Sequence, residues 1–352
     1  MNYVPSGCGV FGIMRKADAP KIGGQTAVTG IEAVRHRGSD LGAGFAVFNS
    51  INSRGYLVKA FAQSIGDIAP ELKMHGLTVV DMKVESTFEN YHSFSFLIEP
   101  VPYDTLNDAV RNINERLWNN YRGRIYSSGD SMDIFKGVGF PAEIADRYNV
   151  RALNGDMWIA HTRQPTNSPG HYPYWSHPFS TFNTAIVHNG DLSSFGSNVE
   201  FLESRGVHSL VGTDSEVTAY VFEELLREGL SIEEATQIMV NRSRRDSGNV
   251  VRNDNVFRGA RLDGPFTTVI GYSTGNDMFL IAMVDRSKFR PAIIGEDQFN
   301  YYVASEEKQI TGISRDARIW ALEPGSYFMA GLKEGIISTG NRRISPYVFS
   351  VA

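Results

Sequence analysis

The sequence predicts an α+β fold in which antiparallel sheets are stacked and helices cover their outer faces. First, β-type runs follow one another at roughly ten-residue spacing in the C-terminal third, as in a meander. These runs are 267–272, 278–284, 291–294, 301–304 and 319–322. Second, several runs are apolar at successive positions, which is expected of strands covered on both faces. Third, helical patterns separate the groups of strands.

The first half of the chain adds shorter elements of the same kinds. Strands are expected at 10–14, 44–48, 157–160 and 185–187, and a short helix at 26–35. Because a typical domain has about 150 residues, a chain of 352 residues could form two domains, but no linker or repeat divides it. The interval from about 51 to 150 has its own helices, near 106–121 and 141–148, and is interpreted as an elaboration of one domain.

Two further helices begin with recognisable capping signals. Apolar Val217, Val221 and Leu225 recur at helical spacing. Thr213 and Glu216 stand before them in the arrangement of a capping box, in which each side chain bonds the other residue's backbone. The sequence Ser-Ile-Glu-Glu from 231 opens the next helix in a similar way.

Composition excludes several classes of function. The net charge of −5 and the pI near 5.9 do not show the excess of basic residues that binding to nucleic acid or to an anionic membrane requires. No window approaches 18 apolar residues, and the N-terminus lacks a signal peptide, so a cytoplasmic protein without membrane spans is expected. A single cysteine excludes an internal disulfide framework, a cysteine zinc ribbon and an iron–sulfur cluster held by this chain alone.

Cys8 lies in Gly-Cys-Gly-Val-Phe-Gly at 7–12, which fits the G-x-G-x-x-G nucleotide pattern. That pattern carries meaning between a strand and a helix, and here only six residues precede it and a β-like run follows. The nucleotide interpretation is therefore disfavoured. The flanking glycines would instead let a ligand approach the thiol. Taken alone, Cys8 could also be a small buried hydrophobe at the start of a strand.

A nucleophilic thiol needs a base, and two kinds are available. Four of the eight histidines, His161, His171, His177 and His188, fall within 28 residues. Their spacing matches no compact metal signature; loop and strand-end positions are favoured over a metal site, which stays as an alternative. The other base is the α-amino group that Cys8 would gain if residues 1–7 were removed, with an ordinary pKa near 8.

Three polar positions in the middle of the chain could complete a site. Arg163 follows a predicted strand and could lie on the surface or clamp a carboxylate through paired hydrogen bonds. Asn189-Gly190 is first a tight-turn signal, but an amide beside an unhindered glycine N–H could also serve as oxyanion donors. Asp214 begins a helix, where the dipole favours a carboxylate, and could equally anchor an ammonium.

Five motifs occur in one order: Cys-Gly-Val-Phe-Gly at 8–12, His-Arg-Gly-Ser-Asp at 36–40, His-Thr-Arg-Gln-Pro-Thr-Asn at 161–167, His-Asn-Gly-Asp at 188–191 and Thr-Asp-Ser-Glu at 213–216. In this order they resemble the class II glutamine amidotransferases, which are N-terminal-nucleophile (Ntn) hydrolases. Asp285-Arg286, Arg290-Pro291 and Ser305-Glu306-Glu307 are similar to C-terminal strands of that family. The resemblance covers most of the chain and is weakest over 51–150.

The resemblance implies a four-layer αββα sandwich and hydrolysis of L-glutamine to glutamate and ammonia through a cysteine thioester. It implies that Cys8 is the nucleophile and its freed amine the base. Asn189 and Gly190 match the residues of the oxyanion hole. Arg163 matches the residue that binds the α-carboxylate of glutamine, and Asp214 matches the residue that binds its α-amino group. Arg37 matches an arginine whose backbone helps to hold the amine of the nucleophile. Thr166 and Asn167 match the stretch that lines the substrate. No metal and no cofactor are implied.

The chain departs from the family pattern because the nucleophile is residue 8. We therefore expect a leader of residues 1–7, whose removal would free the amine, followed by a single type-2 glutamine amidotransferase domain over 8–352. No synthase signature is present, so ammonia would pass to a separate subunit. The long interval between the second and third motifs resembles the glutamate synthase branch, which implies a flavin-dependent partner. The alternative is a catalytically silent glutamine-binding or regulatory subunit that keeps its leader.

Overall fold

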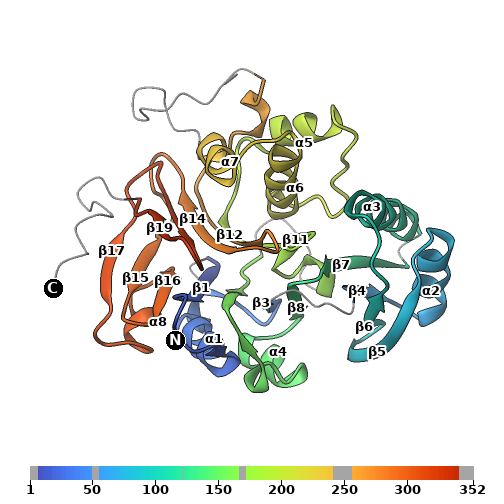
Figure 1. Ribbon diagram of the computed structural model, residues 1–352, viewed down its shortest axis with the longest axis horizontal. Coiled ribbons are helices and arrows are strands. Elements are labelled where there is room, and N and C mark those ends of the chain that lie inside the picture. Colours follow the sequence, from blue (N-terminus) through green and yellow to red (C-terminus); the bar gives the residue numbers. More distant parts are fainter. Residues whose placement is uncertain (1–6, 50–54, 121, 166–171, 241–255, 341–352) are drawn as a thin grey trace.

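The computed structural model describes residues 7–49, 55–120, 122–165, 172–240 and 256–340. Its centre is a pair of stacked antiparallel sheets (Figure 1). The seven-stranded sheet has the order β17 (Arg318–Ala321), β15 (Ile293–Glu296), β16 (Asn300–Ala304), β1 (Gly9–Arg15), β10 (Met157–Thr162), β3 (Ala43–Phe48) and β8 (Met132–Gly137). The six-stranded sheet has the order β11 (Phe179–Thr181), β12 (Thr184–Gly190), β13 (Phe266–Ser273), β14 (Met278–Val284), β18 (Tyr327–Gly331) and β19 (Gly335–Ser338).

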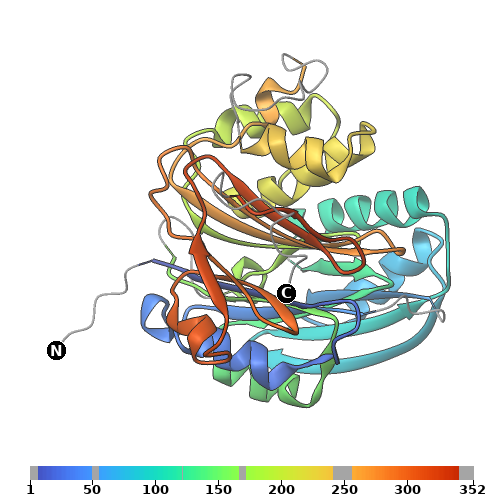
Figure 2. The same cartoon turned by 60° about the vertical axis from the view of Figure 1, so that its left-hand side comes forward.

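Helices cover the outer face of each sheet, which completes four layers (Figure 2). The seven-stranded sheet is covered by α1 (Gly24–Glu32), α4 (Pro141–Arg147) and α8 (Lys308–Thr311). The six-stranded sheet is covered by α5 (Phe195–Glu203), α6 (Asp214–Arg227) and α7 (Ile232–Met239). The central strands are apolar at successive positions because they pack on both faces; all seven residues of β14 are buried. The predicted α+β layers are confirmed.

The C-terminal strands do not form one meander. The chain leaves the six-stranded sheet after β14, builds β15, β16 and β17 in the other sheet, and returns for β18. Regular spacing along the chain predicted the strands themselves but could not show this change of sheet, because strands of both sheets are equally apolar. The strand predicted at 291–294 begins two residues later, at Ile293.

The interval 51–150 contains two structurally different parts. Residues 56–129 form a four-stranded sheet, in the order β5 (Val79–Phe88), β6 (Tyr91–Ile98), β4 (Tyr56–Ala62) and β7 (Gly123–Gly129), with α2 (Ile65–Met74) and α3 (Tyr103–Asn119). This unit, called the insert below, has its own apolar core and lies at one side of the sandwich (Figure 1). Strand β8 and helix α4, from the same interval, belong to the sandwich.

The capping signals of the two later helices have different outcomes. Ser231 and Glu234 form the predicted box at the start of α7. At α6, the Thr213 hydroxyl accepts the Glu216 N–H at 3.2 Å, but the Glu216 carboxylate bonds elsewhere. In the part of the chain that is described, no helix has both the length and the apolar character needed to cross a membrane.

Candidate active site

Cys8 lies immediately before the central strand β1, at the edge of a pocket. The run 7–12 therefore opens a strand, which contradicts the helix that the nucleotide pattern requires. The Cys8 Sγ accepts the backbone N–H of Gln164 at 3.3 Å and lies 3.6 Å from the Gln164 carbonyl oxygen. Burial raises the pKa of the thiol, while the Gln164 N–H and the positive charges of Arg163 and Arg290 act in the opposite direction.

Arg37 holds Cys8 through its side chain. Its Nε donates to the Cys8 carbonyl oxygen at 3.1 Å, and its Nη1 pairs with Glu306 Oε1 at 3.0 Å. Burial opposes ionisation of Glu306, but the hydrogen bonds from Arg37 and Lys308 prevail and lower its pKa. The arginine is thus fixed between the start of β1 and the segment after β16.

The pocket beside Cys8 has a volume of about 310 Å³ and gathers groups from distant segments. Its lining includes Cys8, Arg163, Gly190 and Asp214, so a thiol, a cation and an anion share one cavity. Trp175 and Phe195 add apolar surface. A cavity of this size is typical of a small-molecule site.

Arg163 directly follows β10 and is 3% exposed, which excludes the surface position that its sequence context also allowed. Its Nη1 donates to the Leu41 carbonyl oxygen at 3.2 Å, and its backbone N–H donates to the Gly42 carbonyl oxygen at 2.9 Å. Burial lowers the pKa of the guanidinium, and the neighbouring Cys8 opposes this shift. The guanidinium is therefore a fixed cation in the lining of the pocket.

Asn189 and Gly190 end strand β12 and do not form the tight turn that their sequence favours. Asn189 is 1% exposed, and its Nδ2 has no hydrogen-bond partner among the described residues. Gly190 has φ +153°, and a Cβ there would lie 1.9 Å from the Pro265 carbonyl oxygen. The site therefore combines a buried, unused amide donor with a residue that must be glycine.

Asp214 is the first residue of α6 and points its carboxylate toward the end of β12. Its Oδ2 accepts the Leu192 N–H at 3.1 Å, its Oδ1 accepts the Ser215 hydroxyl at 3.3 Å, and His188 Nδ1 lies 3.6 Å away. Burial opposes ionisation, but the charge and hydrogen bond of His188 and the other donors lower the pKa of Asp214. The carboxylate is thus negative at neutral pH and faces the pocket.

Three of the four clustered histidines come together, and two of them, His177 and His188, line the pocket. His161 stacks on His177 with ring centroids 3.9 Å apart, and its Nε2 lies 3.0 Å from the His188 carbonyl oxygen. His177 and His188 both contact the Ser215 hydroxyl, at 2.8 and 3.2 Å. Burial lowers the pKa of His161 to about 3 and that of His177 well below its usual range. No set of three metal-ligating side chains occurs within the described segments, so the geometry gives the metal site no support.

Three predicted positions, Thr166, Asn167 and His171, lie outside the described residues. No role was predicted for Arg290, although its charge acts on Cys8 and a Cβ built on Gly7 would lie 3.1 Å from its Nη1. The same Cβ would lie 3.5 Å from Asn189 Oδ1, so residue 7 borders the unused amide. Only the late Arg-Pro motif at 290–291 pointed to this arginine.

Similar proteins agree with this geometry, although no family model matches the chain. A putative glutamine amidotransferase of Methanothermobacter thermautotrophicus is 24% identical over 342 residues, which cover 90% of this chain and 97% of that protein. The glutamine amidotransferase-like protein GlxB of Rhizobium meliloti is 28% identical over 208 residues, which cover 58% of this chain and 61% of that protein.

A solved structure shows the same fold. The glutamine phosphoribosylpyrophosphate amidotransferase from B. subtilis superimposes with a TM-score of 0.50 at 19% identity. The match covers 94% of this chain but only 48% of that chain, so this chain spans about half its length. The fold is thus the α+β sandwich of the Ntn-hydrolase type, as predicted. In sequence and in fold, this chain is thus similar to glutamine amidotransferases.

Proposed function

We propose that this chain hydrolyses the side-chain amide of L-glutamine and that Cys8 is the nucleophile. The pocket carries the proposal, because it holds a thiol, a fixed cation and a fixed anion together. Glutamine carries a carboxylate, an ammonium and a neutral amide, so each of its groups has a complement. The Cys8 sulfur attacks the amide carbon, ammonia leaves with a proton, and water hydrolyses the resulting thioester to glutamate.

The substrate's two charged ends would be held by residues from different layers. Arg163, buried directly after β10, would donate hydrogen bonds to the α-carboxylate, and Asp214, at the start of α6, would accept them from the α-ammonium. The direction of the Asp214 pKa shift supports this role because it keeps the carboxylate ionised. Thr166 and Asn167 remain expected contacts of the bound substrate.

The tetrahedral intermediate needs donors for its oxygen. The Asn189 Nδ2 supports this role because it is buried without a partner among the described residues, and a buried donor is normally satisfied. A ligand oxygen would satisfy it. The backbone N–H of Gly190 would be the second donor.

The base in this proposal is the α-amine of Cys8, which exists only after the Gly7–Cys8 bond is cut. Burial raises the pKa of the thiol, so it is protonated at neutral pH and needs a base. While Gly7 is attached, the Cys8 nitrogen is an amide without a basic lone pair. Intact-mass measurement of an active preparation tests this step: the mass should correspond to a chain that begins at Cys8. Turnover by a chain that retains residues 1–7 would refute it.

One observation also favours the alternative of a silent glutamine-binding subunit. Gly7 has φ +112° and borders both Asn189 and Arg290, so a retained residue 7 would stand beside the proposed oxyanion donor and hinder turnover, as a silent subunit requires. Ammonia release from glutamine, measured on cleaved and uncleaved protein, separates the two functions. Activity of the cleaved protein alone supports the enzyme, and glutamine binding without turnover in both forms supports the regulator.

We further propose that the ammonia acceptor is a separate synthase subunit, of the flavin-dependent glutamate synthase type. The long interval between the His-Arg-Gly and His-Thr-Arg motifs supports this branch. Affinity purification of the chain from its own cells tests the partner. A co-purifying flavoprotein whose 2-oxoglutarate amination depends on glutamine is expected, and an acceptor of another chemistry would refute the assignment.

A further inference from the structure

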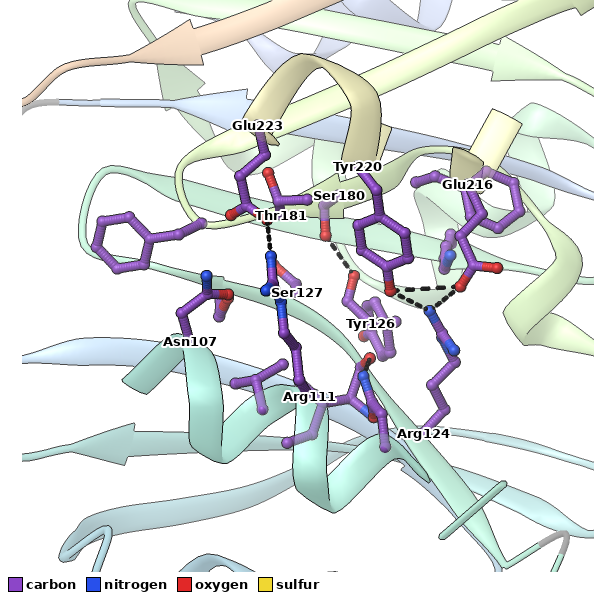
Figure 3. Close-up of a pocket in the computed structure, with 17 residues that line it drawn as sticks. Asn107, Arg111, Arg124, Tyr126, Ser127, Ser180, Thr181, Glu216, Tyr220 and Glu223 are labelled. Carbon is purple, nitrogen blue, oxygen red and sulfur yellow. Dashed lines mark hydrogen bonds and ion pairs between the residues drawn. The ribbon is translucent and has the colours of Figure 1, made fainter. Parts of the chain in front are cut away.

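The insert reaches the candidate site through one buried arginine. Arg124 lies on β7 of the insert, and its Nη2 pairs with the Glu216 carboxylate on α6 and donates to the Tyr220 hydroxyl at 3.1 Å (Figure 3). The two charged side chains of the pair are 7% and 2% exposed. A carboxylate that is removed from water to this degree needs a partner, because an unpaired buried charge is costly.

The other oxygen of Glu216 holds the loop that leads into the pocket. Its Oε2 accepts the Ser209 hydroxyl at 2.6 Å, the Val211 N–H at 2.8 Å and the Gly212 N–H at 3.3 Å. In a capping box this carboxylate would bond the Thr213 backbone. Here it joins Arg124 to the residues just before the pocket.

The loop then enters the pocket directly. Gly212, Thr213, Asp214 and Ser215 all line the cavity beside Cys8. The position of Asp214 therefore depends on where α6 begins, which Glu216 fixes from one side and the Leu192 N–H from the other.

We propose that Arg124 is a positioning residue for glutamine binding. Through Glu216 it fixes the 209–214 segment, so that the insert helps to position Asp214, the proposed ligand of the substrate ammonium. This inference rests on the proposed function and assigns a role to the insert. Arg124 touches no substrate, so its effect must appear in glutamine affinity more than in turnover.

The space around the pair does not suggest a ligand site. The cavity that Arg124, Glu216 and Lys136 line has a volume of about 30 Å³, which is room for about two water molecules. Lys136 already donates to the Pro178 carbonyl oxygen at 3.0 Å. A metabolite does not fit, so support of the loop is the role that the geometry favours.

The chain offers a matched control between the insert and the same helix, α6. Arg111 of α3, also in the insert, pairs with Glu223 of α6 at 3.0 Å (Figure 3). This ion pair joins the insert to the same helix but lies farther along it, and Glu223 bonds no residue of the 209–214 loop in the described structure. Loss of Arg111 therefore weakens the attachment of the insert without releasing the loop.

The test compares Arg124→Met, Arg124→Lys and Arg111→Met. Glutamine KM and kcat are measured on processed protein, and the glutamine Kd by calorimetry in a Cys8→Ala background, where no chemistry is required. For Arg124→Met we expect KM and Kd to rise by about tenfold or more with a smaller change in kcat, because a buried charge loses its partner. Arg124→Lys should recover most of the affinity, and Arg111→Met should leave it within about twofold.

Unchanged KM and Kd in Arg124→Met, or an equal rise in Arg111→Met, would overturn the inference. If Arg124→Met does not fold, Ser209→Ala provides a second test, because it removes one contact between Glu216 and the loop. It should raise KM by about three- to fivefold, the usual effect of one lost hydrogen bond. An unchanged KM in Ser209→Ala would also overturn the inference. Wild-type protein that binds glutamine without turnover would refute the proposed function, and the Kd comparison would still test Arg124. Wild-type protein that neither binds nor hydrolyses glutamine would overturn both.

Discussion

Replacement of Asn189 by alanine should separate catalysis from stability. The Asn189 Nδ2 is buried and has no partner among the described residues, so its removal deletes no hydrogen bond of that nitrogen within them. The loss should appear when the substrate oxygen becomes negative and needs a donor. Removal of one oxyanion donor typically costs about 3–4 kcal/mol of transition-state stabilisation, which is about 10²- to 10³-fold in kcat.

The assay is steady-state ammonia release from glutamine, with urea unfolding of the same preparations. We expect kcat and kcat/KM to fall together, because the interaction forms only in the transition state. The unfolding midpoint should move little. A kcat within about threefold of wild type would remove Asn189 from the oxyanion role, since one lost donor costs far more than that.

Asn183 provides a matched control on the turn before β12. It is also buried, but its Oδ1 accepts the N–H groups of Asp130 and Ser131, and its Nδ2 donates to Asp130 Oδ1 at 2.7 Å. Asn183→Ala should therefore lower stability by about 1–3 kcal/mol and leave the kcat of the folded fraction unchanged. The two variants together show whether an unused buried amide differs in function from a satisfied one.

Three further predictions follow from the geometry of the site. Gly190→Ala should destabilise the protein by more than about 2 kcal/mol in urea unfolding, because its Cβ would lie 1.9 Å from a backbone oxygen; wild-type stability would contradict the described strand end. Asp214→Asn should raise glutamine KM by about tenfold or more with a smaller change in kcat, and an unchanged KM would exclude an ammonium contact. His161 has a pKa of about 3 in the folded state against about 6.5 unfolded, so its contribution to stability is complete above pH 6.5 and is lost as the pH falls toward 3. Urea unfolding at about pH 7 and about pH 4.5 should show a loss from this group of about 1.4 kcal/mol per pH unit, which His161→Asn removes; equal acid sensitivity in both proteins would contradict the neutral, buried ring.

Sequence patterns predicted the sandwich because its strands are apolar and buried on both faces, as in β14 and β3. They missed the strands of the insert. Strand β7 reads Gly-Arg-Ile-Tyr-Ser-Ser-Gly, yet every residue of it is buried. Its polar groups are satisfied by partners from far along the chain, such as Arg124 by Glu216 and the Tyr126 carbonyl by Ser180. A polar strand of this kind has no local signal.

The candidate site was predicted as a set of motifs, and the structure brings Cys8, Arg163, Gly190 and Asp214 to one pocket. The errors concern local rules that tertiary contacts override. Asn189-Gly190 continues a strand because β13 pairs with it up to Phe266. The Glu216 carboxylate does not complete the capping box of α6, because the buried cation Arg124 of the insert competes for it.

The position of β1 has a consequence for how the protein is made. This strand is synthesised before the other described strands, yet its neighbours in the sheet are β10 and β16, at residues 157–162 and 300–304. Cys8, the proposed nucleophile, lies just before this strand and is held by Arg37, which in turn pairs with Glu306. Until residues up to about 306 have been synthesised, the Cys8 sulfur therefore lacks these partners. If Cys8 is the nucleophile, fragments that end before residue 300 should release no ammonia from glutamine.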